Sequence, residues 1–256
     1  MDRHSRSGEA EAVVIIKAAP VVGHKHGETV CCAGIDLEGN WLRLYPISFR
    51  SLEDGQKFKR WDRIRFKWRK PKDDQRVESR RVNPDTLKIV GKLKESERER
   101  FLAQRIVSSL SKERADGRSL ALLNAEIIGF SAERKSDEEI ADQAAEFARI
   151  RAQPDMFNTQ QLIPYKPCPY WFKYRYRTDD GERHGKCQDW EIETTYFKWS
   201  KLYGCKEALA KIQQVFGEEY PEKGMRLAIG THSRYPDTWL INGVVRLNEI
   251  KQPSLF

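Results

Sequence analysis

Residues 63–69, RIRFKWR, alternate between basic and apolar side chains with a period of two. Because successive side chains of a β-strand point to opposite faces, this pattern predicts a strand with one apolar face and one basic face. Ile64, Phe66 and Trp68 would lie inside a core. The chain must pair this strand within a sheet, and the predicted outward row is Arg63, Arg65, Lys67 and Arg69.

Short β-branched and aromatic runs lie on both sides of this strand. AVVIIKAAPVV and ETVCCAGIDLEGNWLRLYPISFR predict a hairpin, with a turn at 38–40. VESRRVNPDTLKIVG predicts a further strand that is closed by a turn at 83–85. Strands this close together favour a small barrel or a strongly curled antiparallel sheet.

Beyond residue 95, helical and strand patterns alternate. Apolar side chains recur at helical spacing in four segments, at 96–110, 136–153, 189–203 and 206–220. SLALLNAEIIGFSAER is expected to return to the first sheet, whereas YWFKYRYR, MRLAIGTH and TWLINGVVRL predict strands of a second lobe. The fold class is therefore α+β, with a curled antiparallel sheet or small barrel in the N-terminal lobe and mixed helices and strands in the C-terminal lobe.

A chain of 256 residues can bury one large core or two modest ones, and the patterns favour two lobes. The expected division is a flexible leader at 1–11, a β-rich lobe with one helix at 12–135, a helix and linker at 136–158, an α+β lobe at 159–250 and an exposed tail at 251–256.

Positive charge is concentrated in one part of the sequence. The formal net charge is +8, and residues 57–81 alone contain twelve basic and four acidic side chains. This segment therefore accounts for the whole excess of positive charge. A basic protein of this kind suits a polyanionic partner, because net charge governs association more than fold.

The composition also bears on the cellular compartment. No apolar run approaches the roughly 20 residues that a membrane helix needs, and the first eleven residues are polar, unlike a secretory signal. The five cysteines are an odd number without a CxxC pair, so reduced thiols are expected. We therefore expect a cytoplasmic protein with no membrane partner.

A second basic row strengthens the prediction of a nucleic-acid surface. In YWFKYRYR, aromatic side chains would face inward and Lys173, Arg175 and Arg177 outward. Cations on such strands can neutralise phosphates, and exposed rings can stack on bases. The alternative is a solvated sheet face, since Lys and Arg also protect edge strands from pairing.

The last five residues, QPSLF, carry a short motif. The sequence resembles the peptide by which bacterial replication and repair proteins dock on the DNA sliding clamp: Gln, any residue, Ser or Asp, Leu, then Phe or Leu. An extended peptide of this kind inserts its last two apolar side chains into a preformed pocket. The matching residues are Gln252, Ser254, Leu255 and Phe256.

A second stretch, QPDMF, fits the same frame with methionine in place of leucine. Its matching residues are Gln153, Asp155, Met156 and Phe157. The alternative is that this Met-Phe pair makes hydrophobic contacts that fix the exit of the preceding helix. The resemblance covers only these two peptides; the rest of the chain resembles uncharacterised bacterial proteins and implies no activity.

GERHGKCQDWE is the densest polar cluster, and its candidate catalytic residues are His184, Asp189 and Glu191. A nuclease places such carboxylates around a divalent metal, but a second carboxylate pair at a recognisable spacing is missing. Asp189 also suits the N-cap of the helix that begins at Trp190. No CxxC pair, Gly-rich phosphate loop or GxSxG motif occurs, so no metal or cofactor is expected.

These features favour a noncatalytic DNA-associated protein that docks on the bacterial DNA polymerase sliding clamp and acts in or on replication and repair. One alternative is a replication-inhibiting toxin that competes for the clamp pocket. A clamp-recruited metal-dependent nuclease and an RNA-binding module are two further alternatives.

Overall fold

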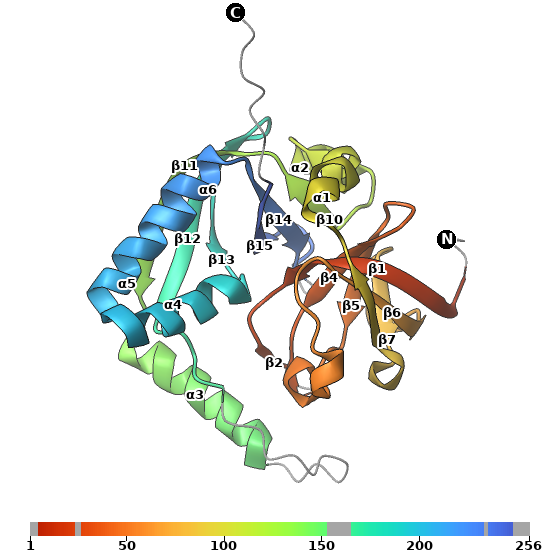
Figure 1. Ribbon diagram of the computed structural model, residues 1–256, viewed down its shortest axis with the longest axis horizontal. Coiled ribbons are helices and arrows are strands. Elements are labelled where there is room, and N and C mark those ends of the chain that lie inside the picture. Colours follow the sequence, from red (N-terminus) through yellow and green to blue (C-terminus); the bar gives the residue numbers. More distant parts are fainter. Residues whose placement is uncertain (1–4, 24–26, 153–164, 233–234, 248–256) are drawn as a thin grey trace, which may run out of the picture.

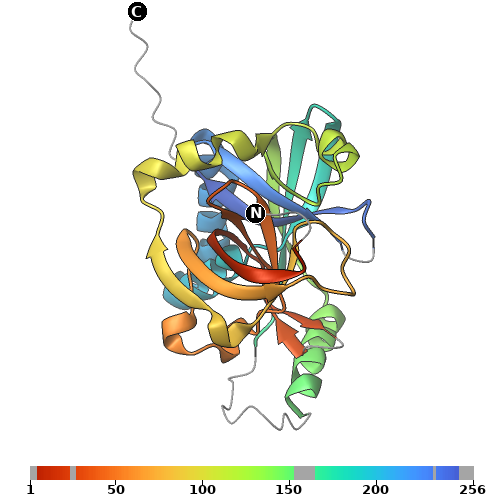
Figure 2. The same cartoon turned by 90° about the vertical axis from the view of Figure 1, so that its right-hand side faces the viewer.

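The first sheet of the molecule is a closed five-stranded barrel with one additional strand. The computed structural model describes residues 5–23, 27–152, 165–232 and 235–247. The barrel order is β1-β4-β5-β7-β6, and pairing between β1 and β6 closes it (Figures 1 and 2). Its strands are β1 Ser7–Lys17, β4 Cys32–Asp36, β5 Trp41–Tyr45, β6 Asp62–Arg69 and β7 Ser79–Val82, with β8 Lys88–Lys92 added on β6.

The second sheet has seven strands in the order β11-β12-β13-β15-β14-β10-β9. These strands are β9 Ile106–Val107, β10 Leu120–Leu123, β11 Glu126–Arg134, β12 Tyr170–Thr178, β13 Gly181–Cys187, β14 Met225–Thr231 and β15 Trp239–Arg246. A small hairpin pairs β2 Val21–Gly23 with β3 Gly27–Thr29. The predicted α+β class, with a small barrel in the N-terminal part, is confirmed.

Helices lie beside both sheets and in the connections between strands (Figure 1). The α-helices are α1 Glu95–Leu102, α2 Leu110–Ala115, α3 Asp137–Ala152, α4 Trp190–Tyr203, α5 Cys205–Ile212 and α6 Tyr220–Glu222. A π-helical stretch, η5 Gln213–Glu219, joins α5 to α6. The 3₁₀ turns are η1 Phe49–Ser51, η2 Asp54–Gln56, η3 Pro84–Thr86 and η4 Ala103–Arg105.

Three apolar layers hold these elements together. Side chains of one parity, such as Val14 and Phe66, fill the barrel. Side chains of the opposite parity of β1, Val13 and Ile15, pack with Leu122 and Val245 of the second sheet. Both faces of β1 are therefore buried, which explains the continuous apolar run AVVII. We call this middle layer, which the two sheets share, the shared layer.

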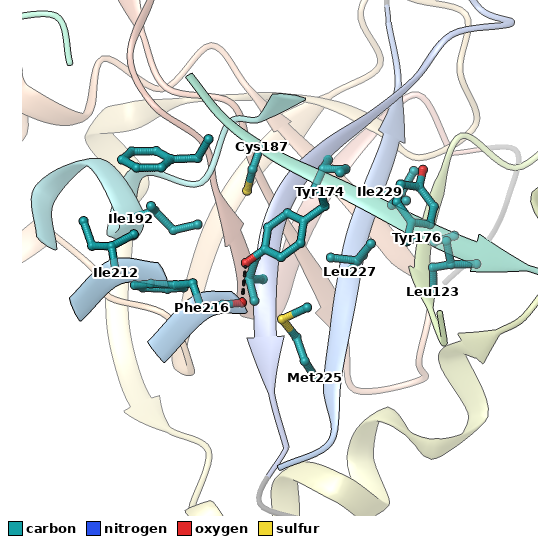
Figure 3. Packing of buried hydrophobic residues seen from close by; sticks show 14 of the residues in the cluster. Leu123, Tyr174, Tyr176, Cys187, Ile192, Ile212, Phe216, Met225, Leu227 and Ile229 are labelled. Atoms are coloured by element: carbon teal, nitrogen blue, oxygen red, sulfur yellow. Dashed lines mark hydrogen bonds between the residues drawn. The ribbon is translucent and has the colours of Figure 1, made fainter. Parts of the chain in front are cut away.

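The third layer lies between the second sheet and its helices (Figure 3). Tyr174 of β12 is fully buried there, and its hydroxyl donates a hydrogen bond to the carbonyl oxygen of Phe216 at 3.0 Å. Ile192 of α4 and Ile212 of α5 cover the same sheet face. Every alternate residue of YWFKYRYR thus faces this core, as the period of two predicts.

The division of the chain differs from the expected one in two places. Ser7–Glu11 is part of β1 and not a flexible leader, because Ser7 to Val13 pair with Arg69 to Arg63 of β6. Strands β9, β10 and β11 belong to the second sheet. The chain therefore passes from the first sheet to the second between β8 and β9, and not at 136–158.

The helix expected at 96–110 is also shorter than predicted. It ends at Leu102, and Ile106 and Val107 form β9, which pairs in parallel with β10. Their apolar spacing fits a helix, but the edge of the second sheet offers backbone hydrogen bonds that favour an extended strand. Within the described ranges, no helix is long and apolar enough to cross a membrane.

Candidate functional site

The basic row of β6 lies on the outside of the barrel, as predicted. Arg65, Lys67 and Arg69 are exposed, whereas the intervening Phe66 and Trp68 are buried in the barrel. The side chains of this row nevertheless differ in what they contact, and the difference follows from the pairing of β6 with β1.

Acidic side chains of β1 neutralise the first half of the row. Arg63 Nε donates to Glu11 Oε1 at 2.8 Å, and Arg65 Nη2 donates to Glu11 Oε2 at 3.2 Å. Arg65 Nε also lies 3.8 Å from Glu9 Oε1. Burial acts to raise the pKa of Glu11, but hydrogen bonds and charge from Arg63 and Arg65 lower it overall. These two arginines are therefore already occupied by a carboxylate.

The second half of the row has no such partner. Among the residues that the structure describes, no acidic side chain forms an ion pair with Lys67 or Arg69. The backbone carbonyl of Arg6 accepts a hydrogen bond from the Lys70 amide at 2.8 Å, which brings further cations to this end of the strand. We call the exposed set at this end the strand-end cations: Arg6, Lys67, Arg69, Lys70 and Lys72.

The row on β12 is neutralised along its whole length. Lys173 forms an ion pair with Glu133 of β11. Arg175 Nε lies 3.4 Å from Glu182 Oε1, and Arg177 Nη1 lies 2.8 Å from Glu126 Oε2. Carboxylates from both neighbouring strands thus alternate with the cations, and this row lies on a different sheet from that of β6.

Asp189 is a structural residue at the start of α4. Its Oδ1 accepts the Glu191 amide at 2.9 Å, so the predicted N-cap is confirmed. Its Oδ2 accepts Arg60 Nη2 at 2.8 Å and the Val244 amide at 2.7 Å. Both carboxylate oxygens of this buried residue are therefore used in holding elements together.

The other two catalytic candidates do not join Asp189 in a reactive group. His184 is exposed on β13, on the parity opposite to the buried Cys187. Glu191 Oε2 lies 3.5 Å from Arg60 Nη2, so Glu191 and Asp189 both form ion pairs with the same guanidinium. Within the described ranges, no group of three or more His, Cys, Asp or Glu side chains is placed to hold a metal ion.

Sequence reasoning missed the junction between barrel and second sheet. Three arginines of the first lobe donate across it to backbone carbonyls. Arg60 reaches the Val244 carbonyl, Arg43 reaches the Ser119 carbonyl at 2.9 Å, and Arg76 reaches the Thr231 carbonyl at 2.8 Å. Periodicity carries no signal for these contacts, because each joins residues far apart in the sequence.

Arg60 is well enclosed: its side chain is 10% exposed, and that of its partner Asp189 is 1% exposed. Burial acts to lower the pKa of Arg60, but the negative charges of Asp189 and Glu191 raise it above its ordinary value. The guanidinium therefore stays charged and connects the loop before β6 to both α4 and β15.

Both peptides with the clamp motif lie outside the described residues. These are Gln252, Ser254, Leu255 and Phe256, and Gln153, Asp155, Met156 and Phe157. Their assignment therefore rests on the sequence.

Comparison with known families divides the chain near the point where it passes from the first sheet to the second. Residues 8–107 match a family described as Domain of unknown function (DUF8758). Residues 103–256, more than half of the chain, match a family described as Domain of unknown function (DUF8757). The two matches meet in η4 and β9, between the barrel and the second sheet. No curated protein matches the chain.

Proposed function

The chain belongs to the DUF8757 family, and from its own residues we propose that it is a cytoplasmic, noncatalytic DNA-associated protein that docks on the bacterial DNA sliding clamp. The observation that carries this proposal is the sequence Gln252-Pro-Ser-Leu-Phe256. It matches the clamp-docking peptide at each restricted position.

The energetics of such a peptide are sufficient for a specific contact. Full burial of Leu255 and Phe256 would contribute about 1.5 to 3 kcal/mol for each side chain. Gln252 can hydrogen-bond at a second subsite, and Pro253 reduces the freedom lost when the peptide becomes ordered. We expect a dissociation constant of about 1 μM, which corresponds to roughly 8 kcal/mol and requires polar contacts of the peptide in addition to its two apolar side chains.

The contacts of Asp189 support the noncatalytic part of the proposal. A metal-dependent nuclease needs carboxylate oxygens that are free to bind a cation. Arg60, Val244 and Glu191 already occupy the oxygens of Asp189. The strand-end cations support the association with DNA.

Titration of purified clamp with the full chain tests the proposal. Replacing Phe256 by alanine is expected to weaken binding about 10- to 150-fold, because the largest buried side chain of the peptide is lost. The matched control is Phe157→Ala in the second peptide, which should bind like the unmodified chain. Isothermal titration calorimetry provides the dissociation constants.

The two variants also separate the two peptides. If Phe157→Ala weakens binding and Phe256→Ala does not, the contact belongs to Gln153–Phe157. If neither substitution changes the affinity, or if the unmodified chain does not bind the clamp, the proposal is wrong.

A further inference from the structure

The strand-end cations form a cluster of positive charge at one end of β6 that can accept an anion. All five are exposed, and no ion-pair partner for their side chains lies within the described part of the chain. Three acids come near. Glu9 lies opposite Lys67 in the β1–β6 register, and Asp85 precedes Thr86, whose Oγ1 accepts the Lys67 amide at 2.9 Å. Asp73 follows Lys72 in the chain and is exposed. Positive charge still exceeds negative charge at this end.

The existing ion pairs determine which cations can bind a new anion without losing a contact to a carboxylate. A phosphate that approached Arg63 or Arg65 would compete with the carboxylate of Glu11. On β12, a phosphate would compete with Glu126, Glu133 and Glu182. At Lys67 and Arg69 it would displace only water and counterions, whose release favours binding.

The buried rings of β6 restrict the kind of nucleic acid. Proteins that bind single strands stack successive bases on exposed aromatic side chains. On β6, Phe66 and Trp68 are 1% and 4% exposed, so their rings cannot receive a base. The outward positions of the strand offer cations only, and contacts of this type reach phosphates and carry no sequence information.

We infer that the strand-end cations bind the phosphate backbone of duplex DNA independently of its sequence, and that the paired row on β12 takes no part. This inference rests on the DNA association proposed above and does not depend on contact with the clamp. It also narrows the predicted surface to Lys67 and Arg69 and adds Arg6, Lys70 and Lys72 to it.

Two matched variants test the inference by fluorescence anisotropy with a labelled duplex of about 20 base pairs, without clamp. One variant combines K67Q, R69Q and K70Q at the strand end; the other combines K173Q, R175Q and R177Q on β12. Each removes three positive charges, so any effect of net charge is equal. Since the substituted side chains lie on the surface, both variants should remain folded. Only the β12 variant should show a small decrease in the thermal unfolding midpoint, because it loses three surface ion pairs.

The strand-end variant should bind the duplex weakly and with a flatter salt dependence. Three lost phosphate contacts reduce the loss of affinity between about 50 and 200 mM salt by roughly 40-fold. The β12 variant should retain the affinity and slope of the unmodified chain. A single strand of equal length should bind less tightly than the duplex.

Three results would overturn the inference: equal weakening in both variants, unchanged binding in the strand-end variant, or tighter binding of the single strand. Absence of duplex binding by the unmodified chain at low salt would overturn it as well. None of these results bears on the titration of the clamp, so the two proposals fail separately.

Discussion

Replacing Arg60 by alanine is expected to lower the free energy of unfolding by about 3 to 5 kcal/mol. The substitution leaves the carboxylate of Asp189, which is 1% exposed, without its positive partner. It also removes the donor to the Val244 carbonyl. Chemical denaturation monitored by tryptophan fluorescence measures the change.

An exposed ion pair provides the control for Arg60. Arg65→Ala breaks a pair in which the arginine side chain is 51% exposed, and such pairs contribute about 0 to 1 kcal/mol. Adding Asp189→Ala to Arg60→Ala should cost less than the sum of the single substitutions, since the two residues share one interaction. A loss below about 1 kcal/mol for Arg60→Ala would show that the junction does not depend on this residue.

Replacing Phe66 by alanine is also expected to cost about 3 to 5 kcal/mol. Phe66 lies within the barrel at 1% exposed, and its removal leaves a cavity among Val14, Leu44 and the other side chains of that core. The loss should appear as a lower denaturation midpoint with little change in the denaturant slope.

Lys67→Ala, one position along the same strand, is the matched control. Because Lys67 points outward, its truncation should change stability by no more than about 0.5 kcal/mol. The two neighbours thus separate folding from binding: Phe66 serves the core, whereas Lys67 serves the surface that we assign to DNA. Similar costs at both positions would contradict the assigned parity.

The sequence predicts strands well where a period of two is strong. In RIRFKWR and YWFKYRYR, the inward and outward faces are as expected, because alternation fixes the face once a strand forms. Boundaries that depend on distant partners are not predicted. Ser7–Glu11 is polar and looks like a leader, yet it pairs with β6, more than 50 residues away along the chain.

The candidate site shows the same division. Periodicity identifies the outward cations on β6 and β12, and the cap at Asp189 follows from local sequence. Which cations are neutralised depends on the register of β1 on β6 and of β11 and β13 on β12, which no single segment encodes. The pair between Arg60 and Asp189 spans 129 positions of the chain and likewise needs the assembled fold.

The shared layer makes the stability of each matched segment depend on the other. Val13 and Ile15 of the barrel and Leu120 and Leu122 of the second sheet bury one another and are at most 1% exposed. Either segment produced alone would expose this apolar face to water and tend to aggregate. The two segments should therefore unfold together in one cooperative transition. Neither segment can be replaced by an unrelated domain unless that domain supplies a complementary apolar face.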